Sequence, residues 1–264
     1  MHPSDETDSL PLVDLNAPGV SGIIGAIPAR YASTRLPGKP LLHIAGRPMI
    51  EHVYQRVSQA EGIARVVVLT DDERIAEVVT RFGGEFEMTP PECASGTDRV
   101  AFAARQWGAQ AVINVQGDEP LIDPEAVSAV ARHLATEPGD DIVTLAAPTL
   151  LGDRDNPHVV KVVLDCAGYA LYFSRSAIPY ARQAGGAAPL KHLGIYGYQR
   201  QALLRLASLP PTPLEISESL EQLRALENGI RIRVLAARRA SPGVDTREDL
   251  ERVERLLGAR RGND

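Results

Sequence analysis

The chain has 264 residues, of which 44% are hydrophobic, and its formal net charge is -6 at pH 7. A chain of this length can bury a substantial core without metal or disulfide staples, and its acidic balance argues against a nucleic-acid partner, which needs clustered Lys and Arg. The two cysteines, Cys93 and Cys166, have no metal-ligand spacing, so we expect a reduced, cytoplasmic setting. No apolar run approaches the roughly 18 to 20 residues of a membrane helix, and no membrane partner is expected.

Residues 1–21 are acidic and proline-rich, and they lack the basic start and apolar middle of a secretion signal. We expect a disordered leader over this stretch. A single domain should follow over residues 22–258, and residues 259–264 should form a short tail.

Short apolar runs alternate with amphipathic stretches along the domain. The β-branched runs predict buried strands, and apolar positions at helical spacing predict helices between them. This alternation is typical of an α/β fold with a mostly parallel, twisted sheet and helices on both faces. In chain order we expect a strand at 23–27, a helix from 48 to 62, a strand at 66–69, helices at 71–81 and 97–107, a strand at 111–115, a helix from 123, a strand at 142–147, a helix at 215–227, a strand at 230–236 and a last helix from about 246.

The alternation breaks over about residues 159–214. The runs 159–164 and 169–173 flank turn-forming residues, which is a hairpin pattern, and 193–198 is a third extended piece. We expect an antiparallel insertion here that covers a substrate or a partner subunit.

Residues 28–41, PARYASTRLPGKPL, directly follow the first strand. Ligands of open parallel sheets bind beyond the carboxyl ends of strands, so this loop lies at the expected binding edge. The cations Arg30, Arg35 and Lys39 suit a triphosphate, although a solvated basic loop is the alternative. The segment matches neither the dinucleotide glycine fingerprint nor the phosphate loop ending in Gly-Lys-Ser/Thr. An ordinary NTPase and a nicotinamide-dependent oxidoreductase are therefore disfavoured.

Two carboxylates are candidates for binding Mg²⁺. Asp118 ends a buried strand within INVQGDEP, where Gln116 also offers an amide to a sugar or base, and a turn acid is the alternative. Asp245 lies in GVDT before the last helix, where it could instead act as a cap beside a Thr246–Asp249 capping box. Because Mg²⁺ usually takes one or two carboxylates plus phosphate oxygens, this pair fits its needs.

Further motifs strengthen this interpretation: SGTDR at 95–99, KVVLD at 161–165, YALYFSR at 169–175, HLGIYGY at 192–198 and LEQLR at 220–224. Together with the three segments above, and in this order, they make residues 22–257 closely resemble the 3-deoxy-manno-octulosonate cytidylyltransferases, also called CMP-Kdo synthetases. The resemblance implies a Rossmann-like fold of the nucleotide-diphospho-sugar transferase type and a homodimer. It also implies an Mg²⁺-dependent transfer of CMP from CTP to the acid sugar Kdo, with release of pyrophosphate, which activates Kdo for lipopolysaccharide biosynthesis.

The resemblance also implies roles for individual residues. Those expected to act in catalysis are Asp118 and Asp245, as metal ligands, together with Arg30 and Lys39. Those expected to bind the nucleotide are Arg30, Ser33, Arg35, Lys39, Ser95, Gly96, Thr97 and Arg99. Those expected to bind the sugar are Gln116, Arg175, His192, Tyr196, Glu218, Glu221 and Gln222. In an unbroken helix, Glu218, Glu221 and Gln222 would share one face.

Each sugar residue also has a simpler interpretation: a solvated helix face, a structural histidine, or an arginine paired with a surface acid. Cys93 departs from the family, in which a histidine is expected at that position. Two alternative functions stay open. One is a cytidylyltransferase for another acid sugar, such as sialic acid, and the other is a binding or regulatory protein that keeps the pocket and performs no transfer.

Overall fold

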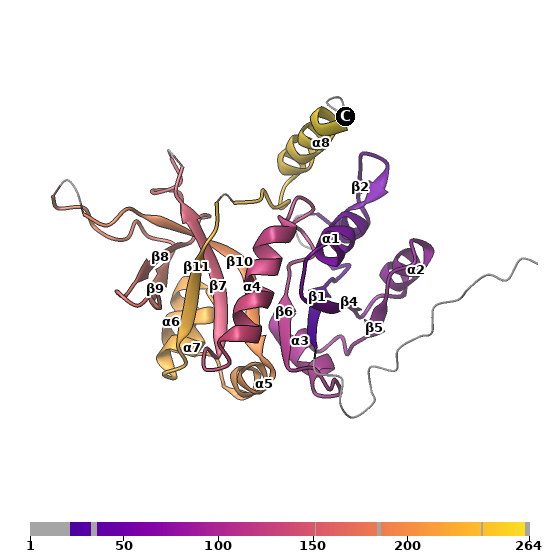
Figure 1. The fold of residues 1–264 in the computed structure, drawn as a ribbon. Helices are drawn as coiled ribbons and strands as arrows, with labels where there is room; N and C mark the ends of the chain where they lie inside the picture. Colours follow the sequence, from indigo (N-terminus) through magenta and orange to yellow (C-terminus); the bar gives the residue numbers. More distant parts are fainter. Residues whose placement is uncertain (1–21, 33–35, 151, 184–185, 239, 262–264) are drawn as a thin grey trace, which may run out of the picture.

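The computed structural model describes residues 22–32, 36–150, 152–183, 186–238 and 240–261 (Figure 1). Its centre is a nine-stranded sheet whose main path runs β11-β7-β10-β6-β1-β4-β5, with β8 and β9 attached through β10. The strands are β1 (Ile23–Pro28), β4 (Ile63–Thr70), β5 (Phe86–Met88), β6 (Ala111–Asn114), β7 (Ile142–Pro148), β8 (Lys161–Leu164), β9 (Ala170–Ser174), β10 (Leu190–Gln199) and β11 (Ile232–Ala236), and a small separate sheet holds β2 (His43–Ile44) and β3 (Arg47–Pro48). The helices are η1 (Lys39–Leu41), α1 (Met49–Ser58), α2 (Glu73–Arg81), α3 (Gly96–Ala104), α4 (Pro124–Thr136), α5 (Arg200–Ser208), α6 (Pro213–Glu218), α7 (Gln222–Glu227) and α8 (Arg247–Arg261).

Helices cover both faces of the sheet, as the sequence predicts. Apolar residues of α1, α2 and α4 pack on one face around Ile27 and Ile113, while α3, α5 and α7 pack on the other around Val112. The adjacent strands β1, β4, β5 and β6 are parallel, and so are β7 and β11. The expected α/β architecture is confirmed. None of the helices in the described part of the chain has the length and apolarity that crossing a bilayer requires.

Polar side chains fix where several helices begin. Asp123 caps α4 by accepting a hydrogen bond from the backbone of Glu125, as its sequence pattern predicts. Thr246 and Asp249 form the expected capping box at the start of α8, since each side chain bonds the other residue's backbone N–H. These caps set the positions of the loops that precede the helices.

The segment expected as an antiparallel insertion contributes directly to the main sheet. β8 and β9 form the predicted hairpin, and β10 lies between β6 and β7, antiparallel to both. The register of β10 against β7 shifts between Leu193 and Tyr196, which marks a bulge. The residues of β10 therefore lie at the centre of the fold rather than in a separate cover.

The expectation of one helix over 215–227 is wrong, because the structure breaks it into α6 and α7. Ser219 adopts a left-handed conformation, with φ 51°, and ends α6. The backbone N–H of Leu220 then bonds the carbonyl of Glu215 at 3.2 Å, which closes the turn. As a result, Glu218 ends α6, whereas Glu221 precedes α7 as its N-cap residue, and the two do not share the face of one helix.

The order of strands reverses at β1. The chain passes from β1 to β4 and β5 on one side and then returns to β6 on the other side. The loops that follow the neighbouring strands β1 and β6 border a crevice at the carboxyl edge of the sheet, which is where open α/β folds bind ligands.

Candidate active site

A cavity of about 410 Å³ opens in this crevice. Its size is within the range of small-molecule sites. Its wall comes from four segments: the loop after β1, the start of α3, the turn after β6 and the segment before α8. The lining residues are Pro28, Ala29, Arg30, Ala32, Lys39, Pro40, Cys93, Ser95, Gly96, Arg99, Gln116, Gly117, Asp118 and Asp245. The structure thus brings together eight residues that the sequence predicts for the site, from segments far apart in the chain.

Both candidate metal carboxylates meet at the ammonium of Lys39. The Nζ atom donates to Oδ2 of Asp118 at 2.6 Å and to Oδ1 of Asp245 at 3.1 Å. It also donates to the carbonyl of Val244 at 3.0 Å. A single cationic group, the ammonium of Lys39, therefore bridges the two carboxylates.

The charge of Lys39 is stabilised by these neighbours. Burial disfavours the charged form, but the nearby carboxylates of Asp118 and Asp245 outweigh it and raise the pKa of Lys39 above its ordinary value. The exposed fractions of the three side chains are 15% for Lys39, 34% for Asp118 and 62% for Asp245. This end of the site is charged and open to solvent, as binding of a charged ligand requires.

Two glycines help the loops that line the cavity to pack closely together. A Cβ at Gly117 would lie 3.0 Å from the backbone oxygen of Pro28, so the absence of a side chain lets the turn after β6 pack on the end of β1. Gly38 has φ 68° and precedes η1, which begins with Lys39. In the sequence, their neighbours mark these two glycines: Gly117 directly precedes Asp118, and Gly38 lies between a proline and Lys39.

The start of α3 forms one wall of the cavity. Ser95 caps the helix by accepting from the backbone of Asp98 at 3.0 Å. The positive end of a helix favours anions, which agrees with the expected nucleotide role of Ser95 and Gly96. Arg99 reaches the edge of the cavity, but its side chain is buried and pairs with Asp71 at 3.1 Å and with Thr89. In the structure Arg99 therefore supports the wall.

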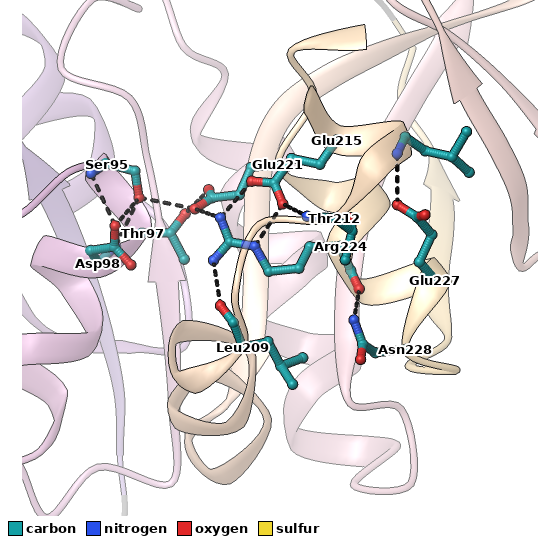
Figure 2. A network of polar contacts seen from close by, with 11 residues as sticks. Ser95, Thr97, Asp98, Leu209, Thr212, Glu215, Glu221, Arg224, Glu227 and Asn228 are labelled. Atoms are coloured by element: carbon teal, nitrogen blue, oxygen red, sulfur yellow. Dashed lines mark hydrogen bonds and ion pairs between the residues drawn. The ribbon is translucent and has the colours of Figure 1, made fainter. Parts of the chain in front are cut away.

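A network of polar contacts connects α3 to α7 (Figure 2). Glu221 accepts from Ser95 at 2.9 Å and from Thr97 at 2.5 Å. Burial raises the pKa of Glu221, although these two hydroxyls act in the opposite direction. Behind it, Arg224 donates to both carboxylate oxygens of Glu215, at 2.8 and 2.5 Å. Thr97 and Glu221, which the sequence assigns to different substrates, are thus direct partners.

A second, small cavity of about 20 Å³ lies beyond this network, and Tyr196, Glu221 and Gln222 are among its lining residues. Thr144 is a polar neighbour of Tyr196. The hydroxyl of Tyr196 is buried and makes no hydrogen bond of regular geometry among the described residues. The same holds for Oδ1 of Asn114, the residue opposite Tyr196 on β6. Buried polar atoms are normally bonded, so both atoms lack the partner that such groups usually have. Sequence reasoning missed Asn114, whose signal is a polar residue ending the apolar run of β6.

His192 lies on β10, next to Tyr196, with a separation of 5.3 Å between ring centroids. Its Nε2 is 3.0 Å from the hydroxyl oxygen of Thr144, and Phe173 packs edge-on against the ring at 5.0 Å. Burial lowers the pKa of His192 to about 3, so the ring is neutral near pH 7. Thr144 was not predicted, although a hydroxyl residue in the otherwise apolar strand β7 is a signal for such a role.

Arg175 and Glu218, both expected at the sugar, bind each other in the structure. The backbone N–H of Arg175 donates to Oε2 of Glu218 at 2.9 Å, and its Nε donates to the carbonyl of Glu218 at 2.7 Å. A fully buried lysine, Lys161, supports them by donating to the carbonyls of Val159, Asn156 and Arg175. Neither cavity is lined by Arg175 or Glu218. Their contact with a sugar stays a prediction.

Ser33 and Arg35 lie outside the described residues, so their roles also stay predictions. Glu119, for which the sequence predicts no role, follows Asp118 directly. Burial and the neighbouring Asp118 raise the pKa of Glu119 to about 8. Its signal in the sequence is its position in the QGDEP turn.

Comparison with known proteins agrees with this geometry. The model of a family described as Cytidylyltransferase matches residues 24–232. A 3-deoxy-manno-octulosonate cytidylyltransferase of Geobacter sulfurreducens is 49% identical over 243 residues, covering 88% of this chain and 97% of the relative. A protein of the same name from Syntrophotalea carbinolica is 51% identical over 245 residues, covering 89% of this chain and 98% of the relative.

Solved structures show the same relationship. The structure of CMP:2-keto-3-deoxy-manno-octonic acid synthetase complexed with CTP has a TM-score of 0.88 and 45% identity, and the match covers 91% of this chain and 100% of that one. A glucose-1-phosphate thymidylyltransferase structure from Bacillus anthracis, with a TM-score of 0.65 and 17% identity, covers 89% of this chain and 95% of that one and shares the fold. On the strength of its sequence, its fold and its converging site residues, the chain belongs to the 3-deoxy-manno-octulosonate cytidylyltransferase family.

Proposed function

We propose that the chain transfers CMP from CTP to 3-deoxy-manno-octulosonate, giving CMP-Kdo and pyrophosphate. The observation that carries this proposal is the convergence of Lys39, Asp118 and Asp245 at the strand-reversal crevice. A relative about half identical to the chain carries that activity in its name, and a closely similar structure is described as complexed with CTP.

The reaction needs no covalent enzyme intermediate. The anomeric hydroxyl oxygen of Kdo attacks the α-phosphorus of CTP and loses its proton to solvent water. A new P–O bond forms, the bond between the α-phosphorus and its bridging oxygen breaks, and pyrophosphate leaves. The chain's part is to hold both substrates in line and to stabilise the negative charge. Arg30 and Lys39 supply cations at the cavity, and the start of α3 supplies backbone N–H groups. The bound sugar would lie toward Tyr196 and Glu221, which provide polar groups at the buried end.

Mg²⁺ is the proposed cofactor, and Asp118 and Asp245 are the residues that would hold it. The fit rests on their arrangement, because both carboxylates already bond one cationic group, the ammonium of Lys39. Two carboxylates are also as many as Mg²⁺ usually takes when phosphate oxygens complete its shell. When bound, the ion would neutralise phosphate charge and favour displacement at phosphorus.

A homodimer and a cytoplasmic setting are further parts of the proposal. Large apolar side chains are exposed around the β8–β9 hairpin, with exposed fractions of 61% for Leu171 and 85% for Tyr180, and Leu150 after β7 is 72% exposed. Such side chains are suited to contact a second copy. Light scattering should give twice the subunit mass. Cys93 and Cys166 are both free, as suits a reducing compartment.

The test of the activity is a pyrophosphate-release assay with CTP and Mg²⁺, in which Kdo and sialic acid are offered in parallel. We expect release with Kdo that exceeds release with sialic acid by at least about 10²-fold in kcat/KM, on the scale of discrimination by a polar binding site. Preference for sialic acid would contradict the assigned substrate. CTP binding without release from either sugar would instead support a binding protein.

A further inference from the structure

The hydroxyl of Thr144 has several polar neighbours in the interior of the sheet: two carbonyl oxygens, an imidazole nitrogen and the Tyr196 side chain. Thr144 is fully buried in β7, and its Oγ1 lies 2.8 Å from the carbonyl oxygen of Ile195 and 3.2 Å from that of Leu193. Nε2 of His192 lies 3.0 Å away. A threonine hydroxyl has one hydrogen to donate and two lone pairs that accept. The two carbonyls and the imidazole therefore compete for the single hydrogen of Thr144, whereas the hydroxyl of Tyr196 can donate its own.

The carbonyls face Thr144 because β10 bulges at this point. Leu193 pairs with Leu145 and Tyr196 pairs with Thr144, so two residues of β10 have no counterpart on β7. A bulge disrupts the regular ladder of backbone hydrogen bonds, and its carbonyls need other donors. The Thr144 hydroxyl is the side-chain donor that the structure places beside them.

The geometry decides where the hydrogen lies. Carbonyl oxygens only accept, whereas an imidazole nitrogen can either donate or accept. If the hydroxyl hydrogen pointed at His192, the oxygens of Thr144 and Ile195 would face each other at 2.8 Å with no hydrogen between them, and their lone pairs would repel. The hydrogen therefore points to the carbonyl, and Oγ1 accepts a hydrogen from Nε2 of His192.

The ring of His192 is held in place on its other sides. Phe173 packs edge-on against it, with ring centroids 5.0 Å apart, and Tyr196 lies 5.3 Å away. The backbone N–H of His192 also bonds the carbonyl of Val160 at 2.9 Å. Since burial keeps the imidazole neutral, the ring carries one hydrogen only. With that hydrogen on Nε2, Nδ1 has a free lone pair, and no hydrogen bond to it is found among the described residues.

We propose that Thr144 is a positioning residue that fixes His192 in the Nε2–H form, so that Nδ1 of His192 accepts a hydrogen bond from a hydroxyl of the bound sugar. The ligand part of this proposal rests on the proposed function. The proposal also limits the role of His192. A neutral ring that donates its one hydrogen to Thr144 cannot donate to the sugar carboxylate, so other residues must supply the donors for that carboxylate.

The tautomer can be read directly from ¹⁵N–¹H long-range spectra of the full chain without any sugar. The chain has six histidines, and the spectrum of His192→Gln assigns the signal of interest. We expect the Nε2–H pattern in the unsubstituted protein and in Thr144→Ser, which keeps the hydroxyl. In Thr144→Val, which keeps the shape and lacks the acceptor, the Nδ1–H form should gain population. An Nδ1–H pattern in the unsubstituted protein overturns the proposal.

Kinetics test the second half of the proposal. Thr144→Val should raise KM for Kdo about five- to tenfold, on the scale of one hydrogen bond, and leave KM for CTP unchanged. Thr144→Ser should restore the value. Thr80→Val is a matched control, because the hydroxyl of Thr80 bonds a carbonyl of its own helix, at 2.9 Å, and it should change neither constant.

Equal changes in both KM values would show a merely structural role for Thr144 and contradict the proposal. If the chain made no CMP-Kdo at all, the proposed function would fail while the spectra still decided the tautomer. The two failures are therefore distinguishable.

Discussion

The two ends of the site are built in different ways. The end that holds Lys39, Asp118 and Asp245 is made of loops, and its charged groups are partly exposed, up to 62% for Asp245. The end that holds His192, Tyr196 and Glu221 is made of a central strand and the start of a helix, and its groups are more enclosed: Glu221 is 28% exposed, and the Tyr196 hydroxyl is buried. The first end stabilises charge with charge, whereas the second relies on hydrogen bonds whose direction is fixed by neighbours.

This difference has an energetic consequence. Exposed charges on loops are largely solvated in the unfolded chain as well, so removing one costs little folding free energy. Buried polar groups must be paired, and removal of one partner leaves the other unsatisfied. We therefore expect substitutions at the loop end to reduce activity with little loss of stability, and substitutions at the buried end to reduce stability as well.

The largest effect is expected for Arg224→Met. The side chain of Arg224 is 8% exposed and pairs with that of Glu215, which is 12% exposed (Figure 2). Without it, the carboxylate of Glu215 is left buried and unpaired, which should lower the free energy of unfolding by about 3–5 kcal/mol. The thermal midpoint should then fall by roughly 10 °C, as measured by calorimetry.

Two further variants sharpen this result. Replacing both partners, in Glu215→Leu with Arg224→Met, should recover most of the loss because no unpaired charge remains. Arg132→Met is a matched control, since Arg132 pairs with Glu125 at 3.6 Å on the surface and both side chains are more than half exposed. It should cost no more than about 1 kcal/mol. An equally large loss in this control would contradict the distinction between the two regions.

At the loop end, Asp118→Ala and Asp245→Ala should each lower kcat by about 10²- to 10³-fold, on the scale of losing a key electrostatic contact. Their thermal midpoints should stay within a few degrees of the unsubstituted protein. Glu125→Gln, which removes an exposed carboxylate on α4, should change neither quantity. Near-normal turnover of either alanine variant would refute the assigned metal ligands.

The loop end could be predicted from the sequence because one rule locates it. Arg30 and Lys39 follow β1, and Gln116 and Asp118 follow β6, and the carboxyl ends of parallel strands lie at one edge of a sheet. The placement of Asp245 depended on the family resemblance, since its local sequence is equally suited to a helix cap.

The buried end could not be predicted in the same way, because it depends on long-range arrangement. Nothing in the apolar pattern of 193–198 shows that β10 lies between β6 and β7, which is what places Tyr196 beside Asn114. The break of the 215–227 helix depends on the left-handed conformation of Ser219, a residue with no special tendency to adopt it. The same break separates Glu221 from α6, and its carboxylate accepts a hydrogen bond from Thr97 of α3.

The smallest expected effect is the pH dependence of the free energy of unfolding that comes from His192 at the buried end. Burial lowers the pKa of His192 to about 3, below the value of about 6.5 in an unfolded chain. Between these values the unfolded chain binds one more proton, so stability is full above about pH 6.5 and falls as the pH decreases toward 3. The contribution of His192 should be a loss of about 1–2 kcal/mol between pH 7 and pH 5.

Urea unfolding at a series of pH values measures this contribution. His192→Gln should flatten the acid side of the stability curve by that amount, because glutamine does not titrate. His158→Gln, at an exposed position, should leave the curve unchanged. Parallel curves for all three proteins would mean that the ring of His192 takes up its proton in the folded state as readily as in the unfolded chain. The buried end would then share the solvated, charge-tolerant character of the loop end, and the contrast between the two regions would be lost.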